Sequence, residues 1–152
     1  MRIKRLYIGD FGIFRNQSLE DIAPGMVVIG GHNRAGKSTF MNVLRYLGYG
    51  FPQGRKLPPP NGKAYEVEAD LETDGNTVYN LKIRGFSKPI VTRSSGDERD
   101  FNSDHNLYGI DEFTYQQLFT IDLNQLDKIP REISGKDVEK LQSILLGAGF
   151  SE

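Results

Sequence analysis

The chain has 152 residues, of which 38% are hydrophobic and 26% charged, and its formal net charge is −1. These values are typical of a folded globular protein with one hydrophobic core, and no apolar run is long enough to span a membrane. The absence of cysteine excludes disulfides, thiolate zinc sites and a cysteine nucleophile, while an N-terminus without a signal sequence predicts a cytoplasmic protein with no membrane partner.

Two short strands are predicted at residues 2–8 and 14–19, joined by a glycine-containing turn. The apolar run Met-Val-Val-Ile at residues 26–29 predicts a third strand. A helix is predicted over residues 37–46, because apolar side chains recur there at helical spacing. Six glycines and prolines within residues 51–63 lead us to expect neither a helix nor a central strand there.

Residues 31–39, Gly-His-Asn-Arg-Ala-Gly-Lys-Ser-Thr, have the spacing G-x-x-x-x-G-K-[ST] of a phosphate-binding loop. The glycines permit a tight turn whose backbone N–H groups point at phosphate oxygens, and the helix that follows adds the positive end of its dipole. Lys37 is predicted to contact the terminal phosphates, and Ser38 to supply a hydroxyl ligand for Mg²⁺. The predicted nucleotide-binding residues are Gly31, Asn33, Arg34, Ala35, Gly36, Lys37, Ser38 and Thr39.

Apolar and polar side chains alternate along residues 65–72 and again along residues 79–84, which predicts two strands with one wet face each. A three-residue loop at residues 74–76, with Gly75 or Asn76 left-handed, best fits the two patterns. That loop pairs Leu71 with Tyr79, Ala69 with Leu81, Val67 with Ile83, Glu68 with Lys82 and Glu66 with Arg84. A further strand is predicted at residues 89–93.

The C-terminal part is predicted to be helical beyond a polar loop at residues 94–106. Asp111 is a suitable N-cap for a helix over residues 112–119, and further helical segments are predicted at residues 122–128 and from Ser134 to about residue 149. Residues 107–112 also loosely match an apolar strand that ends in Asp-Glu, in which Asp111 would hold Mg²⁺ and Glu112 would polarise water. The capped helix is the favoured interpretation.

Charge is unevenly distributed along the chain. Residues 1–64 contain ten Lys and Arg against three Asp and Glu, whereas the remainder contains nine against 17. A basic half could face a polyanion such as DNA. The favoured interpretation is that the two halves interleave in space and largely cancel each other.

In this order, the hairpin, phosphate loop, helix, antiparallel hairpin and helical region resemble the first lobe of the ABC-type ATPase heads of the SMC, RecF and RecN group. The chain looks most like the YhaN-type AAA family. The resemblance rests on four stretches, namely residues 3–14 (I-x-x-L-x-I-x-x-F-G-x-F), 31–40, 113–126 and 146–149.

This resemblance implies an α/β P-loop NTPase fold, as an ABC-ATPase-like N-terminal lobe with an antiparallel β subdomain and C-terminal helices. Residues 1–152 would form a single ATP-binding lobe with three regions, at residues 1–50, 65–93 and 111–149. The lobe would be a fragment of a longer coiled-coil ATPase that acts with DNA in repair or chromosome maintenance.

The same resemblance implies ATP and Mg²⁺ as cofactors, with hydrolysis only after a missing C-terminal ATPase lobe and a head-to-head homodimer complete the site. Related heads place a glutamine near the metal and the attacking water, where this chain has Asp122, with Gln125 three residues later. Phe11 and Arg15 correspond to the adenine side of the site.

Two other functions stay open from the sequence. One is a self-contained P-loop NTPase of GTPase or kinase type, although no Asn-Lys-x-Asp motif for guanine recognition follows the phosphate loop. The other is a non-enzymatic DNA-binding module, whose DNA affinity would fall steeply with salt and ignore ATP.

Overall fold

The computed structural model describes residues 1–54, 57–73, 75–93 and 108–120. The chain divides into two compact units, Met1–Ile110 and Asp111–Glu152. The first unit contains β1 (Arg2–Phe11), β2 (Phe14–Leu19), α1 (Lys37–Tyr46), β3 (Glu66–Glu72), β4 (Val78–Arg84) and β5 (Ile90–Arg93). The described part of the second unit contains α2 (Glu112–Leu118). Neither described helix has the length and apolar character that crossing a bilayer requires.

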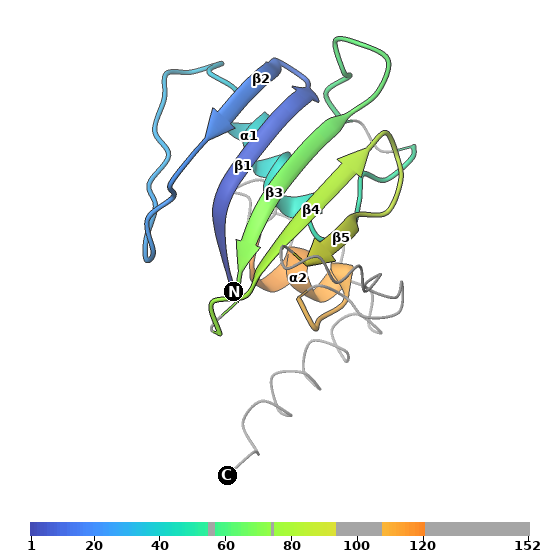
Figure 1. The fold of residues 1–152 in the computed structure, drawn as a ribbon. Helices are drawn as coiled ribbons and strands as arrows, with labels where there is room; N and C mark the ends of the chain where they lie inside the picture. The colour runs from blue at the N-terminus through green and yellow to red at the C-terminus, as the bar shows by residue number, and fades with distance from the viewer. Residues whose placement is uncertain (55–56, 74, 94–107, 121–152) are drawn as a thin grey trace. The chain divides into compact units, whose positions relative to one another are not determined.

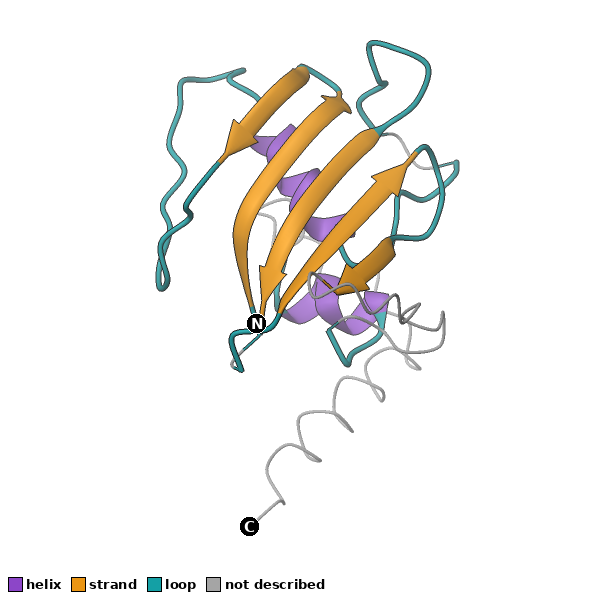
Figure 2. Ribbon diagram, in the orientation of Figure 1, coloured by secondary structure: helices purple, strands orange, loops and turns teal. Residues whose placement is uncertain are grey.

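The five strands form one antiparallel sheet in the order β2-β1-β3-β4-β5. β1 therefore pairs with β3, although the whole of β2 and α1 lies between them in the sequence. Helix α1 crosses one face of this sheet, behind β1, β3 and β4 in the view of Figure 1, and Figure 2 shows the same helix in purple behind the orange strands. The long connection from β2 to α1 passes beyond the outer edge of β2 (Figure 1).

The hydrophobic core lies between α1 and this face of the sheet. It consists of Leu6, Ile8, Phe11, Val43, Tyr46, Leu47, Phe51, Tyr65, Val67, Ala69, Leu71, Leu81, Ile83 and Val91. The rings of Phe11, Phe51 and Tyr65 contact one another, with centroids 4.8 to 5.2 Å apart. The predicted helix is confirmed at its predicted bounds, because the apolar stripe on α1 meets the alternating apolar positions of the strands.

The β3–β4 hairpin confirms its predicted register. All five predicted cross-strand pairs are present, from Glu66 opposite Arg84 to Leu71 opposite Tyr79. Asn76 has the left-handed conformation that the three-residue loop requires, with φ of 57°. The sequence is sufficient to predict this register, because a one-residue slip would turn every apolar side chain of the strand toward water. The strand predicted at residues 89–93 is also confirmed, as β5.

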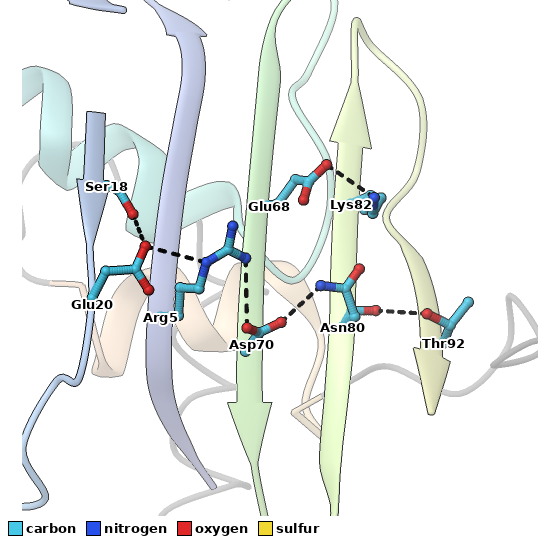
Figure 3. Close-up of polar contacts among 8 residues, drawn as sticks. All are labelled: Arg5, Ser18, Glu20, Glu68, Asp70, Asn80, Lys82 and Thr92. Atoms are coloured by element: carbon cyan, nitrogen blue, oxygen red, sulfur yellow. Dashed lines mark hydrogen bonds and ion pairs between the residues drawn. The ribbon is translucent and has the colours of Figure 1, made fainter. Parts of the chain in front are cut away.

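The opposite face of the sheet carries a chain of polar contacts across all five strands (Figure 3). Arg5 on β1 contacts Asp70 on β3 at 3.5 Å, and Asn80 on β4 donates to the same carboxylate at 2.7 Å. Lys82 pairs with Glu68 at 3.0 Å. Basic β1 lies beside acidic β3, so the two oppositely charged parts of the sequence meet within the described sheet. The interpretation that the two halves of the whole chain cancel each other stays a prediction, because residues 94–107 and 121–152 lie outside the described residues.

The prediction of a strand at residues 26–29 is wrong. These four residues pair with none of the five described strands, and their side chains are exposed, to 94% for Met26 and 85% for Val28. A continuous apolar run is typical of a strand that is covered on both faces, unlike the alternating strands of this sheet. The described residues provide no such double cover, so the run stays at the surface.

The expected fold class and the expected C-terminal helices are each confirmed only in part. The described residues form an antiparallel sheet with one covering helix, which does not reproduce the α/β layout expected of an ABC-type lobe. In the second unit, the helix capped by Asp111 is confirmed as α2. The helical segments predicted at residues 122–128 and 134–149 lie outside the described residues.

Candidate functional site

The glycine-rich loop, residues 31–36, makes a tight turn directly before α1. The Ala35 N–H donates to the His32 carbonyl at 3.1 Å, which closes the turn. Arg34 and Gly36 both have left-handed backbone conformations, with φ of 67° and 90°. The chain therefore turns within the loop and enters α1 at Gly36. The helix after the loop is as the motif leads us to expect, whereas the strand expected before it is absent from the described sheet.

The N-terminal end of α1 is open to solvent and carries no competing negative charge. Gly36 is the N-cap residue, no side chain caps it, and the first turn contains no acidic residue. The first intrahelical bond runs from the Phe40 N–H to the Gly36 carbonyl, at 2.8 Å. The N–H groups of the first turn, at Lys37, Ser38 and Thr39, precede that bond and are thus available to an anion.

Lys37 folds back over the glycine-rich loop. Its ammonium group donates to the backbone carbonyls of Gly31 and His32, both at 2.8 Å. These carbonyls belong to the start of the loop, so the positive charge lies between the two ends of the turn. An anion that reached the N–H groups of α1 would meet this charge, and Lys37 would exchange neutral carbonyl partners for a stronger charge-assisted one.

The β1–β2 turn packs directly against this loop. A side chain at Gly36 would collide with the exposed Ile13 and with Phe14, the first residue of β2. Gly12, in the same turn with φ of 59°, lies against the Thr39 side chain in the first turn of α1. The hairpin that precedes the loop therefore forms one side of the candidate site.

A family model for an AAA domain matches residues 1–151 of this chain. The chain belongs to this AAA domain family. Among curated sequences, it is similar to the uncharacterized protein YhaN of Bacillus subtilis (strain 168), with 27% identity over 132 residues. The match covers 85% of this chain and 14% of YhaN, so the chain spans a small part of that relative's length. The resemblance to the YhaN-type AAA family is thus confirmed.

The eight predicted nucleotide-binding residues of this AAA domain lie together, in the glycine-rich loop and the first turn of α1. Lys37 and Ser38 are exposed side chains of that turn. Ser38 could supply one hydroxyl ligand to a metal held beside a phosphate. Among the residues that the structure describes, no group of three or more His, Asp or Glu side chains is arranged to hold a metal ion.

Other predicted site residues have different outcomes. Asp122 and Gln125 lie outside the described residues. The alternative strand ending in Asp111 and Glu112 is not formed, because residues 108–110 form a turn and bend. Asp111 is instead the N-cap of α2, and its carboxylate accepts from the Thr114 N–H at 3.2 Å. Phe11 is completely buried in the core, so the prediction that it contacts a nucleotide is wrong.

Arg15 is exposed on β2, on the hairpin that packs against the loop. Sequence reasoning missed three other residues beside the site, Asp10, Gly12 and Asn61. Their contacts join segments about 50 residues apart, and no local pattern in the sequence indicates them.

Proposed function

We propose that this AAA domain is the ATP- and Mg²⁺-binding N-terminal lobe of an ABC-like ATPase that acts with DNA in repair or chromosome maintenance. The observation that carries the proposal is the open N-terminal end of α1, with Lys37 held over the glycine-rich loop by two backbone carbonyls. The amides of the loop and of the first turn would bind phosphate oxygens, and the freed Lys37 ammonium would bind the terminal phosphates.

Mg²⁺, when bound, would supply charge neutralisation at the phosphates, with Ser38 as one of its oxygen ligands. The described part of the chain offers no carboxylate cluster to complete such a metal site. Binding without efficient hydrolysis is therefore the expected behaviour of this chain alone, because rate enhancement in phosphoryl transfer depends on groups positioned around the transferred phosphoryl.

A partner lobe from the same longer protein would complete the site. An apolar groove of about 1050 Å³ lies between β1, the edge of α1 and the exposed run at residues 26–29. Phe40 and Leu44, on the side of α1 that lines the groove, are only partly buried. The proposed occupant is a strand of the missing C-terminal ATPase lobe, paired with residues 26–29. YhaN, of which the match covers only 14%, offers ample chain for such a lobe.

Nucleotide binding is tested by titrating the 152-residue chain with MgATP in a calorimeter. Lys37→Ala is expected to weaken binding by about 10- to 100-fold, since a charge-assisted contact contributes about 1.5–3 kcal/mol. Lys88→Ala removes the same charge from an exposed position in the β4–β5 connection and should leave the affinity within about twofold. Equal losses in both variants, or no binding by the wild type, would contradict the proposal.

Steady-state hydrolysis separates this proposal from a self-contained NTPase. The proposal expects no phosphate release above background from the isolated chain at saturating MgATP. Phosphate release that disappears in Lys37→Ala would show that the chain is a complete enzyme and would overturn the need for a second lobe and a head-to-head homodimer.

DNA binding separates the ATPase lobe from a non-enzymatic DNA module. The basic residues of β1 are already paired with acids: Arg2 with Glu72 at 2.5 Å, and Arg5 with Asp70. This pairing lowers the positive field available to a polyanion. DNA binding by the chain that falls steeply with salt, ignores ATP and persists in Lys37→Ala would favour the module.

A further inference from the structure

The proline-rich connection between α1 and β3 is hydrogen-bonded to the end of β1 through the Asp10 carboxylate, and to the β1–β2 turn at Gly12. One oxygen of Asp10 accepts from the Asn61 backbone N–H at 2.7 Å and from the Asn61 side-chain amide at 3.2 Å. The other oxygen accepts from the Gly62 N–H at 2.5 Å. The same Asn61 amide also donates to the Gly12 carbonyl at 2.5 Å. We refer to Asp10, Asn61 and Gly62 as the Asp10 clamp.

Gly12 transmits the position of this clamp to α1. A Cβ atom built on Gly12 would lie 2.7 Å from the Pro58 side chain and 2.9 Å from the Thr39 methyl group. The turn is therefore enclosed between the proline-rich connection on one side and the first turn of α1 on the other. Thr39 directly follows Ser38, so the packing of Gly12 against Thr39 adjoins the residues predicted to bind phosphate.

The Asp10 clamp keeps its charge at neutral pH. Burial raises the pKa of Asp10, but the N–H donors of Asn61 and Gly62, together with the positive charge of Arg15, hold that pKa below its ordinary value of 3.8. Three N–H donors on one ionised carboxylate form stronger bonds than neutral acceptors would make. The clamp is therefore formed at neutral pH, with Asp10 half-buried and Asn61 and Gly62 exposed.

We propose that Asp10 and Asn61 are positioning residues for the phosphate-binding loop, which act through Pro58 and Gly12 on the first turn of α1. This inference rests on the proposed nucleotide binding. Within the described part of the chain, the hydrogen bonds of the clamp reach Gly12 and not the glycine-rich loop, so the effect would be on where the N–H groups of α1 lie. A bound phosphate chain would be affected in the same way whether or not it carries a nucleoside.

The test compares ATP with inorganic tripolyphosphate, by calorimetric titration of the 152-residue chain and its variants. Asp10→Asn and Asn61→Ala are each expected to weaken both ligands by the same factor, about 3- to 30-fold, a range typical of residues that act on a site indirectly. Asp21→Asn removes the same charge from an exposed residue before the loop and should change neither affinity. A loss confined to ATP would assign the clamp to the nucleoside and overturn the proposal, as would no loss for either ligand.

A double-mutant cycle distinguishes a shared clamp from two independent surface effects. If Asp10 and Asn61 act together, the double variant should bind tripolyphosphate about as weakly as the weaker-binding single variant. Fold losses that multiply would contradict a shared role.

Hydrogen exchange tests the clamp without any ligand. The Phe40 N–H, which forms the first bond of α1, should exchange faster in both clamp variants than in the wild type or in Asp21→Asn. Amides of β3 and β4 should be unchanged, which excludes general unfolding. If the wild type bound no nucleotide, the proposed function would fail, while faster Phe40 exchange would still show that the clamp positions α1. Unchanged exchange would contradict the clamp itself.

Discussion

Strand β3 and the segment at residues 26–29 are both rich in apolar residues that favour strands, yet the structure treats them in opposite ways. In β3, Val67, Ala69 and Leu71 are buried, and the residues between them face water as acids. The segment at residues 26–29 has no polar residue, belongs to none of the described strands and is exposed.

The difference shows what each pattern requires of its surroundings. A strand with alternating side chains needs cover on one face only and a hydrogen-bonding strand on each side. For β3, α1 covers the apolar face, and β1 and β4 are the neighbouring strands. A strand with two apolar faces needs cover on both sides. Apolar content alone therefore does not predict membership of this sheet, whereas alternation does.

The largest expected effect comes from making the same substitution in the two regions. Val67 is fully buried and Val28 is 85% exposed. Val67→Ala should lower the free energy of unfolding by about 2–4 kcal/mol, because it removes two buried methyl groups and leaves a cavity. Val28→Ala should change it by less than about 0.5 kcal/mol.

Urea unfolding followed by circular dichroism measures both changes. A large loss of unfolding free energy in Val28→Ala would mean that residues 26–29 are covered in the folded chain. Their difference from β3 would then be wrong.

A smaller difference in stability is expected between two glycines that have the same backbone conformation but different packing around them. Gly50 and Gly54 have φ of 88° and 80°. A Cβ at Gly50 would lie 2.6 Å from the Ser87 carbonyl oxygen, whereas nothing lies within 4 Å of one at Gly54. Gly50→Ala should cost about 1–3 kcal/mol more than Gly54→Ala, since both share the backbone strain and only one has the collision. Equal losses in thermal unfolding would mean that the connection before β5 is not packed against the end of α1.

The smallest effect is expected on the wet face of the sheet. Glu68 and Lys82 are paired at 3.0 Å, but the lysine side chain is more than half exposed. A double-mutant cycle with Glu68→Gln and Lys82→Gln should give a coupling of about 0.2–1 kcal/mol that shrinks at high salt. Replacing Lys82→Gln by Lys88→Gln in the cycle should give no coupling. A coupling well above this range would mean that ion pairs, rather than alternation, determine the β3–β4 register.

The parts of the fold that the sequence predicts are those that follow from local spacing. The β3–β4 register follows from alternation on both strands with a turn of fixed length between them, and α1 follows from its apolar stripe. The glycine-rich loop is predicted for the same reason, because its geometry depends on nine consecutive residues. Asp111 is recognisable as an N-cap because its partner, Thr114, is only three residues away.

The remainder depends on contacts that no local pattern encodes. The failure at residues 26–29 arises because strand propensity says nothing about whether a partner strand is present. The Asp10 clamp joins residues 51 and 52 positions apart, at the end of β1 and in the proline-rich connection, and neither sequence indicates the other as its partner. Burial of Phe11 depends on Phe51 and Tyr65, which lie far along the chain.

Gly36 has a second role that affects how mutations of the loop should be interpreted. A side chain at this position would strike Ile13 and Phe14 of the preceding hairpin, even with the site empty. The exposed Ile13 side chain can move aside, but the left-handed backbone of Gly36, with φ of 90°, disfavours any side chain there. Replacing Gly36 would therefore strain the entry to α1 and confound that strain with loss of binding. The exposed Lys37 side chain donates to two loop carbonyls within the described part of the chain and has an ordinary helical backbone, so its replacement reports on ligand binding without that ambiguity.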